Sequence, residues 1–138
     1  AIIVTTPNDI ALADVRKGAD MFKKVDTPLL GVVENMSYMN IDGKFKVGNE
    51  SSPDIELYVN NKKILLNNDM SFNVRFNLFK EGGGLNESKR LEIPFLGEIP
   101  YSNDLMRSID SGTPIVFEET ESEIKNIFIE LAKKVTLL

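Results

Sequence analysis

Two short apolar runs in this sequence end abruptly in polar or turn-forming residues. Residues 31–38 read GVVENMSY, and residues 94–100 read PFLGEIP. Ligands of open α/β sheets bind beyond the carboxyl ends of the strands, so side chains at such strand ends are candidate binding groups. Asn35 stands just past the first run, and its amide can donate and accept hydrogen bonds together, which matches the ring edge of adenine or guanine. The alternative is that Asn35 hydrogen-bonds its own turn, and we favour this role when the residue is taken alone.

The second run has two interpretations as well. Pro100 follows a predicted strand over 95–99, where its apolar ring and exposed backbone groups can lie against a planar base. Prolines also end strands in proteins of every kind, which is the simpler interpretation. Ser102 is most simply the cap of the next helix.

Three glycines, Gly82 to Gly84, precede a predicted helix and can form an anion-binding nest, because bare backbone N–H groups and a helix N-terminus attract phosphate. The run lacks the lysine and hydroxyl of a phosphate loop, and the pattern G-x-x-x-x-G-K-[ST] occurs nowhere in the sequence. We therefore favour a hinge role for these glycines. No set of residues in the sequence amounts to an active site.

Composition limits the classes of protein. The chain has 138 residues, 42% hydrophobic and 27% charged, which suits one globular domain spanning 1–138. It contains no Cys and no His, which excludes disulfides, thiolate metal sites and an imidazole base. The net charge of −5 and a pI near 4.8 argue against nucleic-acid binding. No apolar run could span a membrane and no signal peptide is recognisable, so we expect a cytoplasmic protein that binds no membrane.

The start of the chain predicts a parallel crossover unit. Residues 2–5 form an apolar run typical of a strand that is covered on both faces. Thr6 and Asp9 suit the cap and the first turn of a helix. A second strand over 29–33 completes the strand–helix–strand unit of the α/β class.

The middle of the chain, roughly 39–80, changes to a period of two. Residues 55–60 and 72–78 alternate apolar and polar side chains, and Asp42-Gly43 and Asn60-Asn61 are typical of hairpin turns. We interpret this segment as an inserted antiparallel β-meander that lies outside the parallel sheet.

The α/β pattern then resumes with a short helix over 85–91. For the helix capped by Ser102, we expect three apolar residues to face inward: Leu105, Met106 and Ile109. Residues 114–117 predict a last strand, and Thr120 and Glu123 form a capping box before an amphipathic C-terminal helix. The fold class is therefore α/β, a partial doubly wound and mainly parallel sheet with an inserted antiparallel β-meander.

Five segments together resemble the Mrp (ApbC) family of deviant P-loop ATPases, relatives of the nitrogenase iron protein and of septum-site ATPases. In order, they are VTTPND with ALAD (4–9 and 11–14), GVVENMSY, FKEGGG (79–84), IPFLGEIP (93–100) and DSGTP (110–114). The resemblance covers about two-thirds of the chain, everything outside roughly 39–78. ENMSY followed by the glycine-led helix and PFLGEIP is specific to this family among its relatives.

The resemblance implies a P-loop NTPase-type sheet and a protein that assembles or transfers iron–sulfur clusters using ATP and Mg. It implies that Asn35 contacts the adenine, with Pro100 and Tyr101 lining the base pocket. Many relatives carry an acidic residue two places after the proline, where this chain has Ser102. The chain begins inside a predicted strand, so we expect a truncated sequence whose phosphate loop and magnesium-binding segments lie upstream of Ala1.

Many family members also carry Cys-x-x-Cys shortly after the ENMSY-type segment, where a cluster can bridge two subunits. Residues 39–42 of this chain read MNID, and the chain has no Cys, so it cannot hold a cluster by thiolates in that manner. The β insertion takes this place and is expected to act as an interface, which favours a homo-oligomer.

We therefore predict an ATP-binding protein of the Mrp type, with iron–sulfur apoproteins as partners. This chain carries the adenine side of the site and no phosphate loop, so we expect it to have no ATPase activity alone. The alternative is a protein-interaction or scaffold module that uses the β insertion and binds no nucleotide. A third possibility is a partitioning or septum-site protein of the same superfamily. The lack of a terminal basic amphipathic helix speaks against its membrane-docking members.

Overall fold

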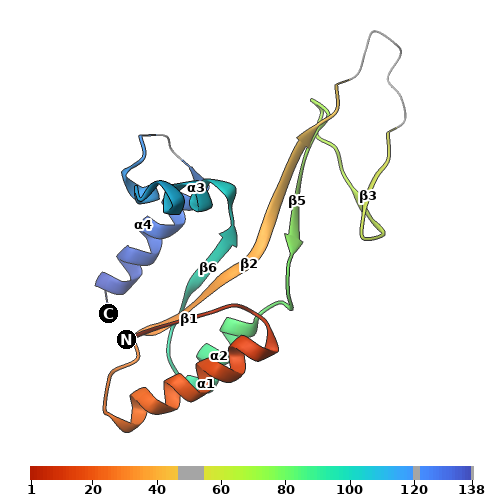
Figure 1. Ribbon diagram of the computed structural model, residues 1–138. Helices are drawn as coiled ribbons and strands as arrows, with labels where there is room; N and C mark the ends of the chain where they lie inside the picture. The colour runs from red at the N-terminus through yellow and green to blue at the C-terminus, as the bar shows by residue number, and fades with distance from the viewer. Residues whose placement is uncertain (47–54, 120–121, 138) are drawn as a thin grey trace. The chain divides into compact units, whose positions relative to one another are not determined.

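The computed structural model describes residues 1–46, 55–119 and 122–137. The elements follow in the order β1 (Ile2–Thr5), α1 (Asp9–Lys24), β2 (Gly31–Lys44), β3 (Leu57–Val59), β4 (Lys62–Ile64), β5 (Ser71–Asn77), α2 (Gly83–Leu91), β6 (Phe95–Tyr101), α3 (Asn103–Ser111), the 3-10 helix η1 (Ile115–Phe117) and α4 (Glu123–Thr136) (Figure 1). They divide into a first unit, Ala1–Met39 with Asn77–Leu138, and a second unit, Asn40–Phe76. Within the described ranges, no helix combines the length and apolar character needed to cross a membrane.

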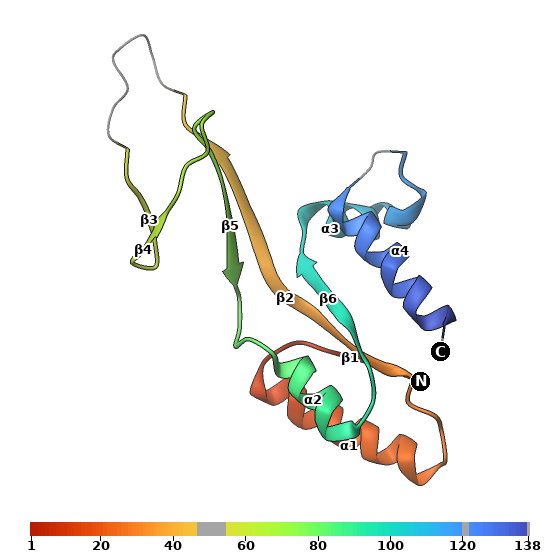
Figure 2. The same cartoon turned by 180° about the vertical axis from the view of Figure 1, so that it is seen from behind.

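The first unit is built on a parallel sheet. β2 lies in the middle, with β1 on one side and β6 on the other, both parallel to it. Helices α1 and α2 lie side by side on one face of this sheet, and α3 and α4 lie on the other face (Figures 1 and 2). One core cluster contains Val32 and Leu91 on the α1–α2 face, and a second contains Val33, Leu96 and Ile99 on the α4 face. The predicted α/β class with a mainly parallel sheet is confirmed.

β1 is covered on one face, so the expectation of cover on both faces is wrong. Ile3 and Thr5 are buried, whereas Ile2 is 39% and Val4 is 56% exposed. The reason is that α1 packs against one face of β1, while the core on the other face is built from β2, β6 and α4. β1 therefore presents an apolar stripe beside the α4 face of the sheet.

Asn8, and not Thr6, caps α1. The Oδ1 atom of Asn8 accepts the N–H of Ala11 at 2.8 Å, and its extended backbone is typical of a cap. The predicted cap of α3 is confirmed, because Ser102 Oγ accepts the N–H of Leu105 at 3.3 Å. α4 is capped by Ser122, and Thr120 of the predicted capping box lies outside the described residues.

Two expectations for the segment after β6 are wrong. On α3, Leu105 packs inward against the α4-face core, but Met106 is 46% and Ile109 is 64% exposed. Residues 114–117, predicted as a strand, form the turn of η1, in which the N–H of Phe117 bonds to the carbonyl of Pro114 at 2.9 Å. This local bond satisfies the backbone that a strand would have paired with a neighbour.

In the second unit, β5 lies beside β2 and runs in the opposite direction (Figure 1). The expectation that the whole insertion lies outside the parallel sheet is therefore wrong for β5, because β2 extends beyond Met39 and pairs with it, whereas β3 and β4 form a separate sheet. The Asn60-Asn61 hairpin is confirmed, because it joins the antiparallel pair β3 and β4 and both asparagines have positive φ. The turn predicted at Asp42-Gly43 is wrong, since both residues lie inside β2. The ring of Phe72 fills the space where a side chain on Gly43 would lie, which explains the glycine without a turn.

Candidate functional site

A groove of about 630 Å³ lies in the first unit, beside the carboxyl ends of β1 and β6 and beside Asn35 within β2. Such strand ends are where open parallel sheets bind ligands. The walls are mainly apolar, as in most small-molecule sites. The lining residues are Val4, Asn35, Ile99, Leu105, Ser108, Ile109, Gly112, Pro114, Ile115, Val116 and Phe128.

Asn35 lines this groove because it lies two residues after Val33 on the same face of β2, and an irregularity of the strand follows it. The predicted strand end after Val33 is wrong, because β2 continues to Lys44. The register with β6 instead breaks between Asn35 and Met39, and Met36 has a positive φ of 54°. Such a break re-aims side chains without ending a strand. The N–H of Met36 donates to Asn35 Oδ1 at 3.0 Å, so the predicted local bond of Asn35 is confirmed.

The local bond uses only the side-chain oxygen of Asn35, so its NH2 group can still donate hydrogen bonds. Its Oδ1 accepts from Met36, and no partner for its NH2 group occurs among the described residues. The other polar side chain of the groove, Ser108, is engaged, because its Oγ donates to the carbonyl of Thr113 at 2.6 Å. The groove thus combines apolar walls with one amide donor pair, which suits a planar, largely apolar ring with a hydrogen-bond acceptor on its edge.

The other two candidate residues do not line the groove. Pro100 is buried within β6, which continues through it, and Tyr101 is 38% exposed in register with Met39. The apolar walls of the groove were not predicted from the sequence, and two of their residues, Val4 and Ile99, come from strands. Their positions near the ends of β1 and β6 could have marked them as candidates. The face of the sheet to which each side chain points, however, depends on the register between strands.

The glycine run binds an anion of the protein itself. The N–H of Gly84, in the first turn of α2, donates to the carboxylate of Glu34, which is 2% exposed. A side chain on Gly84 would lie 3.0 Å from Glu34 Oε2, and one on Gly83 would lie 3.0 Å from the Cα of Pro7. The residue before α2, Gly82, has no side chain to cap the helix, so Glu34 does so from β2. These glycines permit close packing, and the N–H of Gly84 is already bound to Glu34.

A buried carboxylate on α2 joins the two helices of the same face. Glu87 is 1% exposed, and its carboxylate receives Arg16 of α1 at 3.1 Å and Arg90 of α2 at 2.5 Å. Burial disfavours the charged form and is the largest single influence. The hydrogen bonds and charges of Arg90 and Arg16 together outweigh it and hold the pKa of Glu87 below its ordinary value of 4.5. These ion pairs lie on the sheet face opposite the groove, where the pair of Arg16 with Glu87 holds α1 and α2 together.

The lowered pKa of Glu87 predicts a pH dependence of stability. Ionised Glu87 stabilises the fold above pH 4.5, and this contribution is lost as the pH falls through the lower pKa of the folded state. Urea denaturation between about pH 7 and pH 3 should show a smaller acid-induced loss of stability in Glu87→Gln than in the wild type. Glu92→Gln, an exposed control beside the same helix, should match the wild type. Equal acid dependence in Glu87→Gln and wild type would refute the assignment.

The described residues contain no group of three or more His, Cys, Asp or Glu side chains placed to hold a metal ion. The complete sequence also contains no Cys. An iron–sulfur cluster therefore finds no thiolate ligand in this chain.

A family model described as ParA: NUBPL iron-transfer P-loop NTPase matches residues 1–53 and 54–136. The chain is 34% identical over 135 residues to the iron-sulfur cluster transfer protein NUBPL of Dictyostelium discoideum, covering 98% of this chain and 33% of that protein. It is 35% identical over 135 residues to the iron-sulfur cluster carrier protein of Salmonella typhimurium, covering 98% and 29%. The chain thus spans about a third of the length of these curated relatives.

A solved structure shares the fold. The crystal structure of the cell division ATPase MinD of Pyrococcus furiosus matches 99% of this chain and 42% of that chain, with a TM-score of 0.60 and 20% identity. At this identity the similarity concerns the fold alone. It confirms that the parallel sheet is of the P-loop NTPase type.

Proposed function

The chain belongs to the family of NUBPL iron-transfer P-loop NTPases, and from this premise we propose that it forms the base-binding side of the nucleotide site in an ATP-dependent iron–sulfur cluster carrier. The resemblance to the Mrp family is confirmed by the same matches. Two relatives are named as a transfer protein and a carrier protein of iron–sulfur clusters, which supports a role in cluster transfer.

The observation that carries the proposal is the groove that Asn35 lines beside the carboxyl ends of β1 and β6. An adenine ring has two apolar faces and ring nitrogens that accept hydrogen bonds. The walls offered by Val4, Ile99 and Phe128 and the NH2 group of Asn35 match these features. In this proposal Pro100 and Tyr101, the two residues of β6 that follow Ile99, lie at the margin of the base.

The residues present fit the base of ATP but not its phosphates or Mg. The sequence has no phosphate loop, and the backbone N–H of Gly84 that could have served as a substitute is bound to Glu34. We propose that the phosphates and Mg are held by a segment outside this chain. Because phosphoryl transfer depends on positioning those phosphates and stabilising their charge, the chain alone should hydrolyse no ATP.

The cluster enters this proposal as cargo. Since the chain offers no thiolate, the cargo is held by other residues of the full protein or of a partner. We propose iron–sulfur apoproteins as the acceptors, an oligomer as the working form and the cytoplasm as its compartment. The names of the relatives support the acceptors.

The proposal predicts that Asn35→Ala weakens binding of ADP to the chain. Loss of the amide donor should raise the dissociation constant about ten-fold, as expected for one hydrogen bond to a buried acceptor. Isothermal titration calorimetry with ADP measures this change. Asn86→Ala, which removes an exposed amide on α2, is the matched control and should bind like the wild type. If the wild type and both variants bind no ADP, the interaction-module alternative replaces this function.

A further inference from the structure

β6 contains one extra residue relative to the stretch of β2 with which it pairs. This extra residue determines which β6 side chains face the groove. Val32 pairs with Phe95, but the next residue, Val33, pairs with Gly97. Leu96 is therefore left without a partner, as in a β-bulge. Gly97 has a φ of 154°, a value that side-chain-bearing residues rarely adopt.

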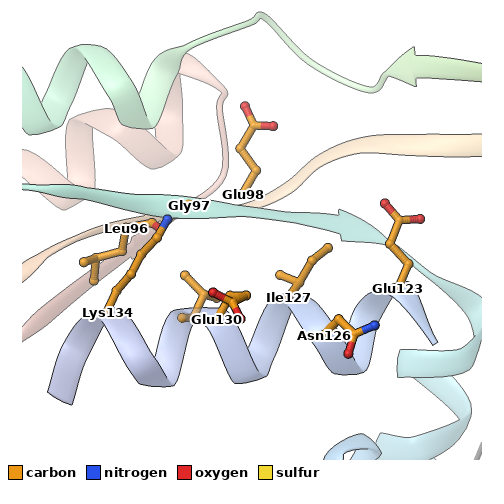
Figure 3. Close-up of a pocket in the computed structure, with 9 residues that line it drawn as sticks. Leu96, Gly97, Glu98, Glu123, Asn126, Ile127, Glu130 and Lys134 are labelled. Atoms are coloured by element: carbon orange, nitrogen blue, oxygen red, sulfur yellow. The ribbon is translucent and has the colours of Figure 1, made fainter. Parts of the chain in front are cut away.

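The bulge reverses the faces of every β6 residue that follows it. Neighbouring parallel strands place paired residues on the same face, so Ile99 shares a face with its partner Asn35. Glu98 shares the opposite face with Glu34, and Figure 3 shows its side chain pointing away from α4. Without the extra residue, alternation from Leu96 would put Glu98 on the α4 face and Ile99 on the face of α1 and α2. The apolar wall that Ile99 gives to the groove therefore depends on the bulge.

A side chain of α4 binds the backbone at the bulge. Lys134, in the last turn of α4, extends to β6, and its Nζ donates to the carbonyl of Leu96 at 2.6 Å (Figure 3). A bulge disrupts the ladder locally, a backbone carbonyl there needs a partner, and a charged donor is a strong one. The contact with α4 is close, because a side chain on Gly97 would lie 3.2 Å from Leu131 Cδ2.

We propose that Lys134 is a positioning residue for the groove. By holding the carbonyl of Leu96, it fixes the bulge and so places Ile99 beside Asn35. Lys134 itself does not line the groove. The inference rests on the proposed function only for its effect on nucleotide affinity, since its effect on the register of β6 is independent of any ligand.

Three variants test the proposal. Lys134→Met keeps the apolar stem but removes the donor, and Lys134→Arg keeps a donor. Lys133→Met is the matched control, because Lys133 is the preceding residue and pairs with Glu130 at 2.7 Å on the surface. Two measurements are made on each: nuclear Overhauser effects between Asn35 and Ile99 together with amide exchange of 97–101, and calorimetric titration with ADP.

The expected result is that Lys134→Met weakens or loses the Asn35–Ile99 contacts and speeds amide exchange over 97–101 about ten-fold or more, while Lys133→Met matches the wild type. ADP affinity should fall about ten-fold in Lys134→Met and recover in Lys134→Arg. A Lys134→Met protein with wild-type contacts and exchange would overturn the proposal. A wild type that binds no ADP would refute the proposed function instead, and the register measurements would still decide the role of Lys134.

Discussion

Replacing Glu34 with Ala is expected to lower the free energy of unfolding by about 3 kcal/mol. Glu34 is 2% exposed, and its carboxylate receives the N–H of Gly84 at the start of α2. The substitution leaves that N–H buried without its partner and removes the only side-chain cap found for α2 among the described residues. It also leaves a cavity between β2 and α2. Urea denaturation followed by circular dichroism measures the loss.

Glu34→Gln is the matched variant for this prediction. Its amide oxygen can still accept the N–H of Gly84, so it should recover part of the stability lost in Glu34→Ala, while lacking the charge that favours a helix N-terminus. Amide exchange should also quicken at the start of α2 in Glu34→Ala. A Glu34→Ala protein as stable as the wild type would show that this carboxylate does not anchor α2.

Gly31→Ala is expected to destabilise the chain by about 3 kcal/mol through overpacking. A Cβ at this position would lie 2.6 Å from Leu96 Cγ and 2.8 Å from the carbonyl oxygen of Pro94. That carbonyl cannot move away freely, because it accepts the N–H of Val32 at 2.9 Å in the ladder between β2 and β6. Thermal and urea denaturation measure the effect.

Gly18→Ala is the control for Gly31→Ala, with the opposite expected sign. Nothing lies within 4 Å of a Cβ at Gly18, which is inside α1. The substitution should raise stability by about 0.5–1 kcal/mol, because glycine costs more conformational entropy than alanine in a helix. Similar stabilities for the two alanine variants would contradict the packing described at Gly31.

The sequence predicted those elements whose signals are local. The C-terminal amphipathic helix, the Ser102 cap and the Asn60-Asn61 hairpin depend on residues a few positions apart, and these three are found. The inward face expected on α3 is not, because Met106 and Ile109 are exposed. The caps of α1 and α4 were misassigned to Thr6 and Thr120, because several Ser, Thr and Asn residues near each helix start have similar capping ability.

The features missed by the sequence analysis depend on distant contacts. Glu34 and Gly84 are 50 residues apart, and nothing near either one indicates that the first caps the helix of the second. The length of β2 was missed because an asparagine after an apolar run is typical of a strand end, whereas here a register break at Met36 lets the strand continue. Asn35 was proposed from its local chemistry and does line the groove, but the residues around it there were not predicted.

The central claim is that the groove lined by Asn35 receives the base of an adenine nucleotide, and its most direct test is a titration of the ¹⁵N-labelled chain with ADP followed by NMR. The account predicts that chemical-shift changes concentrate at groove residues such as Val4, Asn35 and Ile99, while α1 and α2 on the opposite sheet face stay unchanged. No shift at millimolar ADP, or shifts confined to α1 and α2, would contradict it.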